Sequence, residues 1–307
     1  MDNEYLYVVI PYFYTAPSES NVQNLLMSIN EFSNCKNVKL IIAEGIFKKN
    51  KTQLKCLKNV VFQHYKIFFE DVLWIKENLL NIVLQQTSQW KYAAWVDKDI
   101  KFVESNWATN TITELNNCDV LQPFDRCVYL DKRGLHSTED TNFFNKLDKK
   151  KSGTISFCCG ALGKGPKNGA AMHPGQAWAI NKTFFNKFGK LFERGIIGGG
   201  DCVIVEAIRQ NKNHPIYKHY GQPFFDFCDK FKDVKIGYVP GTIYHRYHGN
   251  LRTRKYHSRM DLFTKYKFDV STDLKLLPGG QIQLSSSGKR YSQYIEDFFN
   301  TRNEINY

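Results

Sequence analysis

Two aspartates, Asp97 and Asp99, follow directly on the apolar run Tyr92–Val96. A continuous apolar run is typical of a parallel strand covered on both faces, and ligands of such sheets bind beyond the carboxyl ends of the strands. Residues one apart on an extended segment point to the same side, so both carboxylates can address one target. A divalent cation such as Mn²⁺ or Mg²⁺ would relieve their repulsion. The alternative is an acidic turn with Lys98 as its solvated partner.

Asp201 is a second acid in a suggestive context, because it follows the three glycines Gly198–Gly200. Glycines let the backbone approach a ligand closely, and the apolar stretch after them predicts a helix that begins near Asp201. We interpret Asp201 either as a general base or as a helix N-cap, which is a common use of aspartate.

Trp178 follows a turn at Pro174–Gly175 in the stretch HPGQAWAI. It is interpreted as a sugar-stacking platform or as a core tryptophan. The loop-forming segment 142–172, rich in Lys, Gly, Ser and Asn, precedes it. That segment is either an ordinary surface loop or a lid that faces an acceptor.

The segment Tyr244–Arg259 combines cationic and imidazole side chains. Arginine forks match phosphate oxygens well, so the segment could clamp a pyrophosphate. His245 or His248 could complete a metal shell, and the strand-like GTIYH favours His245. A solvated basic face is the alternative. The cationic residues are Arg246, Arg252, Arg254, Lys255 and Arg259.

The elements that must position these residues alternate along the chain. Strand-like and helix-like patterns follow one another, which predicts an α/β fold with a mostly parallel central sheet and crossover helices. The expected strands are 5–10, stopped by Pro11, then 37–47 and 92–96, and the expected helices lie within 21–32 and 72–86. Further helices are expected over 177–188, with Gly189 as C-cap, after Gly200, and in the amphipathic tail 291–307.

Length and composition limit the classes to which the protein can belong. The 307 residues suffice for a sizeable core, and the formal net charge of +12 favours anionic partners. No apolar stretch approaches the roughly 20 residues of a membrane span, and no secretory signal is visible. We therefore expect a cytoplasmic protein, with peripheral membrane contact through its basic surface and a homodimer as further partner predictions.

Taken together, the motifs resemble a metal-dependent nucleotide-sugar glycosyltransferase of the GT-A fold, in a family-2-like branch found in bacteria and large DNA viruses. The matching stretches occur in the expected order and span nearly the whole chain. The resemblance implies a glycosyltransferase domain over 1–270 and a C-terminal extension over 271–307. The matching stretches are VVIPYF, WIKENLLNI, AAWVDKDIKF, HPGQAWAI, GIIGGGD, HRYHG and YIEDFFNTRNE.

The resemblance also implies residue roles. Asp97 and Asp99 look like the Asp-x-Asp pair that holds Mn²⁺ or Mg²⁺, the first also reaching the nucleotide, and a late histidine, His245 or His248, looks like a further ligand. Asp201 looks like the base of an inverting enzyme, although many relatives carry a second acid where this chain has Gly200. The residues that look nucleotide-facing are Pro11, Tyr12, Lys76, Trp178, Arg252 and Lys255.

The implied activity is transfer of a hexose from a nucleotide-diphosphate donor, most simply a UDP-sugar, to the hydroxyl of a glycan or glycoconjugate. One competing hypothesis is a sugar-1-phosphate nucleotidylyltransferase. That class carries a Gly-rich loop after the first strand, where this chain has PYFYTAPSES. Another is a non-catalytic glycan- or nucleic-acid-binding protein, in which the acids would repel phosphates. We expect no nucleic-acid partner.

Overall fold

The computed structural model describes residues 4–300 apart from seven internal gaps, and every structural statement refers to those residues. The gaps are 16–18, 49–51, 53, 55–59, 136–152, 166–171 and 249–257. Arg252, Lys255 and most of the segment 142–172 therefore lie outside the described residues.

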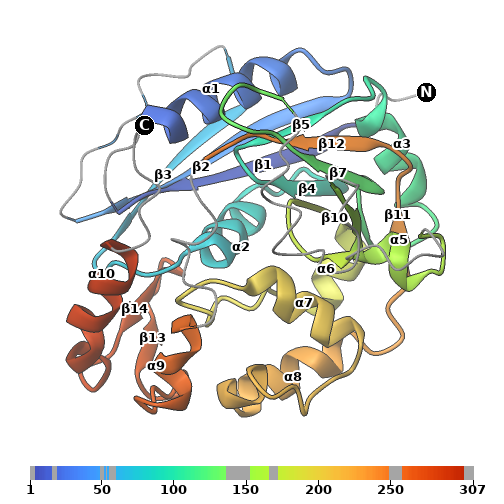
Figure 1. Cartoon of the computed structure of the whole chain (residues 1–307). Helices are drawn as coiled ribbons and strands as arrows, with labels where there is room; N and C mark the ends of the chain where they lie inside the picture. Colours follow the sequence, from blue (N-terminus) through green and yellow to red (C-terminus); the bar gives the residue numbers. More distant parts are fainter. Residues whose placement is uncertain are drawn as a thin grey trace.

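A seven-stranded sheet forms the centre of the molecule (Figure 1). Its pairings are parallel except those of β10, which runs antiparallel to both of its neighbours. The predicted α/β fold with a mostly parallel sheet is thus confirmed. The strands, in spatial order, are β11 (Ile236–Tyr238), β6 (Val120–Gln122), β10 (Ala177–Asn181), β4 (Tyr92–Val96), β1 (Leu6–Phe13), β2 (Val38–Phe47) and β3 (Gln63–Phe69).

The first strand does not stop at Pro11, as we expected, but continues to Phe13. Pairing with β4 ends at Val9, whereas pairing with β2 continues to the end of the strand. Pro11 therefore lies where the ladder to β4 has already stopped, and a residue without an N–H group is tolerated there. Strand β3 was not expected from the sequence.

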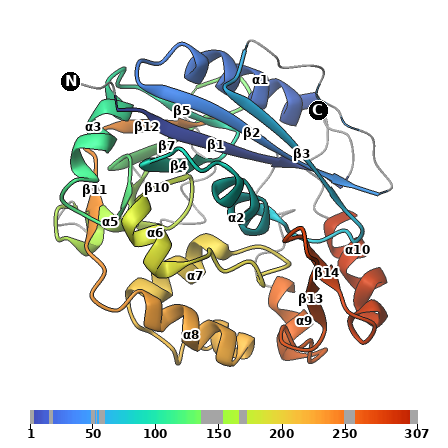
Figure 2. The ribbon, with the colours of Figure 1, turned by 180° about the vertical axis from the view of Figure 1, so that it is seen from behind.

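Helices cover both faces of the sheet (Figures 1 and 2). Alternate residues of β1 serve the two faces: Val8 and Ile10 pack with α1 and α3, and Val9 packs with α2. Apolar burial on both sides explains why the strand is continuously apolar. The helices are α1 (Glu19–Ser33), α2 (Lys76–Gln86), α3 (Trp107–Glu114), α6 (Lys182–Phe188), α7 (Gly200–Ile208) and α8 (Gln222–Lys230).

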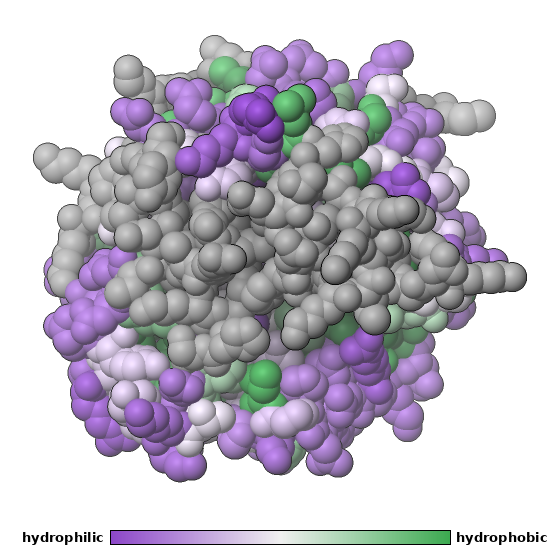
Figure 3. All heavy atoms as spheres, in the orientation of Figure 1, coloured by the Kyte–Doolittle hydropathy of each residue, from purple (hydrophilic) through white to green (hydrophobic). Residues whose placement is uncertain are grey.

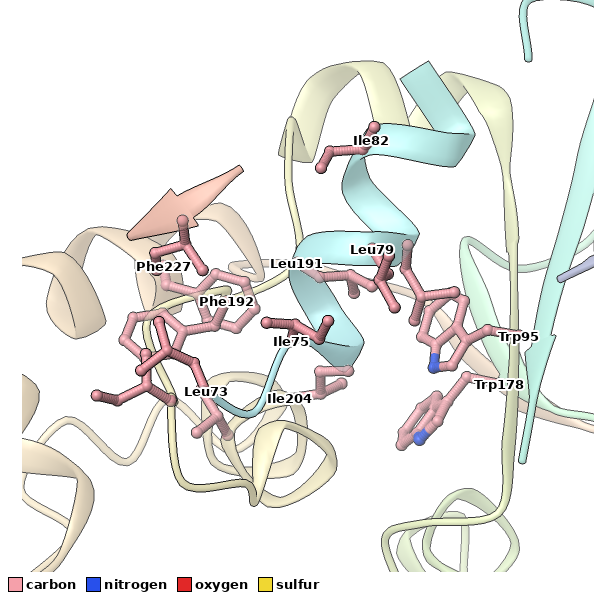
Figure 4. Packing of buried hydrophobic residues seen from close by; sticks show 14 of the residues in the cluster. Leu73, Ile75, Leu79, Ile82, Trp95, Trp178, Leu191, Phe192, Ile204 and Phe227 are labelled. Atoms are coloured by element: carbon pink, nitrogen blue, oxygen red, sulfur yellow. The ribbon is translucent and has the colours of Figure 1, made fainter. Parts of the chain in front are cut away.

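The stretch 177–181 is a central strand, not the start of a helix as expected. It pairs with β4 so that Trp178 lies opposite Trp95, and Figure 4 shows the two indoles side by side with Leu79 of α2 toward Trp95. An apolar segment between two strands satisfies its backbone in the sheet, and the helix begins only at Asn181, whose side chain accepts from the Phe184 N–H. The predicted C-cap, Gly189, is confirmed with a positive φ of 89°.

A second, five-stranded sheet lies beside the first. It brings the end of β12 next to the segment that follows β4, because β12 and β5 pair antiparallel with His245 opposite Ile100. Its strands are β5 (Ile100–Phe102), β12 (Thr242–His245), β7 (Arg126–Tyr129), β8 (Gly153–Ser156) and β9 (Met172–His173), and the short α5 (Phe157–Ala161) follows β8.

The C-terminal part contains a hairpin as well as helices, next to α2 in both views (Figures 1 and 2). The side chain of Asn78 in α2 accepts from the Ile282 N–H at 3.0 Å, and Asp71 accepts from the Leu284 N–H at 2.8 Å. The extension boundary at residue 270 stays a prediction. The elements are α9 (Asp261–Thr264), β13 (Leu274–Leu276), β14 (Ile282–Leu284) and α10 (Ser292–Asn300).

The surface drawn in Figure 3 is mostly hydrophilic where its residues are coloured, with apolar side chains scattered singly. In the part of the chain that the structure describes, none of the helices combines the length and the apolar character that a membrane span requires.

Candidate active site

Lys76 joins two of the predicted site residues. It is the first residue of α2, and its ammonium nitrogen lies 2.7 Å from Oδ1 of Asp97 and 3.1 Å from Oδ2 of Asp201. Asp97 follows β4, and Asp201 lies in the first turn of α7. One buried cation therefore ties the end of the central sheet to the start of α7, and the two acids singled out in the sequence lie at one site.

The carboxylates of Asp97 and Asp99 have different partners. Residues 97–99 form a turn, in which the Ile100 N–H donates to the Asp97 carbonyl at 3.2 Å, rather than the extended segment that we expected. Asp97 is therefore turned to Lys76, whereas Asp99 lies against two histidines. The expectation that both acids point to the same side assumed strand geometry beyond Val96, whereas the chain turns there and the two carboxylates have different partners.

Asp99, His245 and His248 form a buried cluster in which one ligand atom from each lies within 4.8 Å of the others. Nε2 of His248 lies 3.1 Å from Oδ2 of Asp99 and 3.2 Å from Nε2 of His245. Both histidines that competed as ligands thus belong to the cluster. Two imidazole nitrogens and a carboxylate suit Mn²⁺ or another first-row divalent metal, so the residues fit the metal that the fold resemblance implies.

The two histidines reach Asp99 because of how β12 ends. The strand runs antiparallel to β5, and the Arg246 N–H donates to the Asp99 carbonyl at 2.8 Å. This bond fixes the chain after His245 over the turn at 97–99. Backbone hydrogen bonds thus hold together possible metal ligands that are far apart in the sequence.

Asp201 is held by an unusual backbone. Gly198 and Gly199 have φ values of 91° and 96°, a region that favours glycine, and Gly199 takes the N-cap position, so Asp201 itself is not the N-cap. Each glycine also has a side chain pressed against it, so that a β-carbon would meet a neighbour. The neighbours of Gly198, Gly199 and Gly200 are Trp74, Arg259 and Glu77, respectively.

Burial and charge shift the titration of the groups around Lys76. Burial raises the pKa of the Asp201 carboxyl, against the opposing effect of Lys76. Burial alone would lower the pKa of Lys76, but the carboxylates of Asp201 and Asp97 outweigh it and raise that pKa. Lys76 is therefore a permanent cation, and Asp201 binds a proton more readily than an ordinary aspartate.

Glu77 is the second carboxyl group of this region, and the sequence analysis missed it. It is 4% exposed, and burial raises its pKa to about 8. An acid in the first turn of an amphipathic helix ordinarily faces solvent and complements the helix dipole, so the sequence carries no signal of its burial.

Glu44 is a further acid that the sequence analysis did not single out. It is fully buried at the carboxyl end of β2, 3.0 Å from Nε2 of His64 and 2.8 Å from the Thr52 hydroxyl. Burial raises the pKa of the neighbouring Tyr12 and Tyr14 phenols, and Glu44 adds to both shifts. An acid inside the apolar run KLIIAEGIF was the available signal.

Three further predicted site residues, Trp178, Pro11 and Tyr12, are buried. Trp178 is 0% exposed, and its indole N–H donates to the Pro174 carbonyl at 2.8 Å. A ring without an exposed face cannot stack on a sugar, so the core interpretation describes Trp178. Pro11 and Tyr12 are buried at the end of β1.

No protein-family model and no curated protein matches this sequence. Among solved structures, the chain is similar to S. aureus TarS 1–349 in complex with UDP-GlcNAc, at 10% identity and a TM-score of 0.43. The match covers 80% of this chain and 59% of that one, so this chain spans less than two thirds of TarS 1–349.

Two further solved structures match over most of this chain. Glucosyl-3-phosphoglycerate synthase from Mycobacterium tuberculosis, in complex with Mn²⁺, UDP and glucosyl-3-phosphoglycerate, matches at 12% identity over 92% of this chain and 87% of that one, with a TM-score of 0.43. A 4-diphosphocytidyl-2C-methyl-D-erythritol synthase from Anaerococcus prevotii matches at 10% identity over 86% and 99%, with a TM-score of 0.36. With TM-scores below 0.5, these similarities do not decide the function.

Proposed function

We propose that this protein is a metal-dependent, inverting glycosyltransferase that moves a hexose from a nucleotide-diphosphate donor, with UDP as the first nucleotide to test, to an acceptor hydroxyl. One observation carries the proposal. The turn at 97–99 presents one acid to a buried pair of histidines and the other to Lys76, which also holds Asp201. A cluster of three possible metal ligands and a separate, partly buried carboxylate thus lie at one end of the sheet.

The metal would be held by Asp99, His245 and His248, with Asp97 kept as a residue that faces the donor. When bound, a divalent cation supplies positive charge against the diphosphate, which becomes more negative as the sugar leaves. Arg252 and Lys255, outside the described residues, are proposed to add to this charge, and Pro11 and Tyr12 to border the nucleotide.

Asp201 is proposed as the general base. In the reaction, the acceptor oxygen forms a bond to the anomeric carbon while the carbon–oxygen bond to the diphosphate breaks. The acceptor proton passes to the Asp201 carboxylate, and the leaving nucleotide diphosphate carries away the negative charge. Lys76 opposes the rise in the pKa of Asp201 and so favours its ionised form, while burial makes the carboxylate a better proton acceptor. Such proton transfer contributes about 10²–10⁴-fold.

The direct test incubates the protein with a panel of nucleotide sugars and Mn²⁺ and follows nucleoside diphosphate release by chromatography. Release from one donor, lost in Asp201→Asn, supports the proposal. A nucleotidylyltransferase would instead release pyrophosphate from a nucleoside triphosphate and a sugar 1-phosphate. A binding module would do neither, and that result would refute the transferase assignment.

A further inference from the structure

The carboxyl group of Glu77 occupies the space beside Gly200. A β-carbon added to Gly200 would collide with the γ-carbon, the δ-carbon and one oxygen of Glu77. Gly200 is helical and, unlike the two glycines before it, does not have a positive φ. The backbone conformation therefore does not require glycine here, and the three atoms nearest to the added β-carbon all belong to Glu77.

The backbone of Glu77 is held in place, because α2 is fastened on both sides. Asn81 accepts from the Leu191 N–H at 2.8 Å and donates to the Glu193 carboxylate at 2.9 Å. Asn78 donates to the same carboxylate at 2.7 Å and accepts from the hairpin at Ile282. These bonds hold α2 against the segment that leads into the glycine turn.

The surroundings of Glu77 favour its neutral form. Burial raises its pKa, the nearby charges of Asp201 and Asp97 add to the shift, and Lys76 opposes it. The buried phenol of Tyr220 also lies close enough to feel its charge. At neutral pH, Glu77 is thus mainly a protonated, uncharged group packed on the residue before Asp201.

We propose that Glu77 is a positioning residue for Asp201, an inference that rests on the proposed role of Asp201 as the base. The Glu77 carboxyl group reaches from α2 into the space that a side chain of residue 200 would otherwise fill. By packing on Gly200 it fixes the first turn of α7, and so the direction of the Asp201 carboxylate. The carboxyl group beside the base therefore comes from another helix, not from the adjacent residue.

A relocation experiment tests this. Glu77→Ala removes the carboxyl group and should lower kcat about tenfold or more at nearly unchanged donor KM, because a small displacement of a catalytic group costs up to about 10²-fold. Gly200→Glu in that background supplies a carboxyl group from the adjacent residue and should restore most of the lost kcat. Glu77→Gln keeps the size of the group and should retain most of the activity. Rescue by Gly200→Glu would show that the loss in Glu77→Ala does not reflect misfolding.

The matched control is Gly200→Ala, which should lower kcat in the wild-type background and not further in Glu77→Ala, because the collision has been removed. A wild-type kcat in Glu77→Ala, or an additive effect of the two single changes, would overturn the inference while leaving the transferase intact. If the wild-type protein turns over no nucleotide sugar, the proposed function fails and this inference fails with it.

Discussion

The ammonium nitrogen of Lys76 lies 3.1 Å from Oδ2 of Asp201, although the two residues are 125 positions apart in the sequence. The contact sets the charge of the proposed base. Burial raises the pKa of the Asp201 carboxyl, and the positive charge of Lys76 opposes that rise, so without Lys76 the carboxyl would bind a proton still more readily. Lys76 also forms an ion pair with Asp97, so its positive charge is divided between two carboxylates.

Replacing Lys76 with Met should therefore raise the pKa of Asp201 further. We expect transfer to fall at pH 7 and to recover partly as the pH rises, because the carboxyl must ionise to act as a base. We also expect a loss of about 2 kcal/mol in unfolding free energy at neutral pH, since two partly buried acids lose their partner. Rate–pH profiles and denaturant titrations measure both effects.

The control is Lys76→Arg, which keeps the charge in altered geometry. Its transfer rate should rise over the same pH range as that of the wild type, but to a lower maximum. If the transfer rate of Lys76→Met depended on pH as that of the wild type does, Lys76 would not govern the protonation of Asp201.

Asp201→Asn should reduce transfer by about 10²–10⁴-fold, the range typical of a lost general base. Binding of UDP should stay close to that of the wild type, because the predicted donor contacts lie elsewhere. Kinetics with the identified donor, together with calorimetric titration of UDP, separate the two effects. Retention of most of the activity would place the base on another residue.

The cluster of Asp99, His245 and His248 predicts that Mn²⁺ stabilises the protein. A ligand present at a hundred times its dissociation constant stabilises by about 2.7 kcal/mol, which appears as a rise in Tm. The rise should disappear on chelation and in Asp99→Ala and His248→Ala, and metal-dependent nucleotide binding should disappear in Asp99→Ala as well. Thermal melts and calorimetry with and without Mn²⁺ measure this, independently of activity.

Asp97→Asn is the informative comparison for the metal. Because Asp97 faces Lys76 rather than the histidines, we expect it to keep the Mn²⁺-dependent rise in Tm and to weaken nucleotide binding. Loss of the metal effect in this variant would mean that Asp97 turns to the metal when the ion binds.

Glu77 predicts a pH dependence of stability. Its pKa rises from the ordinary value of 4.5 to about 8 on folding, so above pH 4.5 the unfolded chain releases a proton that the folded protein retains. Its contribution therefore disfavours the folded state increasingly as the pH rises from about 4.5 to 8, by up to about 1.4 kcal/mol per pH unit, and levels off above that.

In Glu77→Gln this contribution should vanish, so the variant should gain stability relative to the wild type between pH 5 and pH 8. Denaturant midpoints at several pH values test the difference. Parallel pH curves for the two proteins would show that Glu77 ionises normally.

The sequence predicted the local elements wherever a side-chain period was clear. The helix within 72–86 and the strand 92–96 were found because their apolar residues are spaced for one buried stripe and for two buried faces, respectively. The prediction of a helix failed for residues 177–181, where a short apolar run has no period that distinguishes a strand from a helix. Only pairing with β4 and β6 decides between them.

For the site, the sequence by itself determined which residue types were available: Asp97, Asp99 and Asp201 beside apolar runs and glycines, with histidines in a basic stretch. The tertiary structure alone decided the partners of each. It separated Asp97 from Asp99 at a turn, brought His245 and His248 to Asp99, and buried Lys76 and Glu77 beside the start of α7. The physical reason is that charge pairing and burial depend on contacts between segments more than a hundred residues apart, which local spacing does not encode.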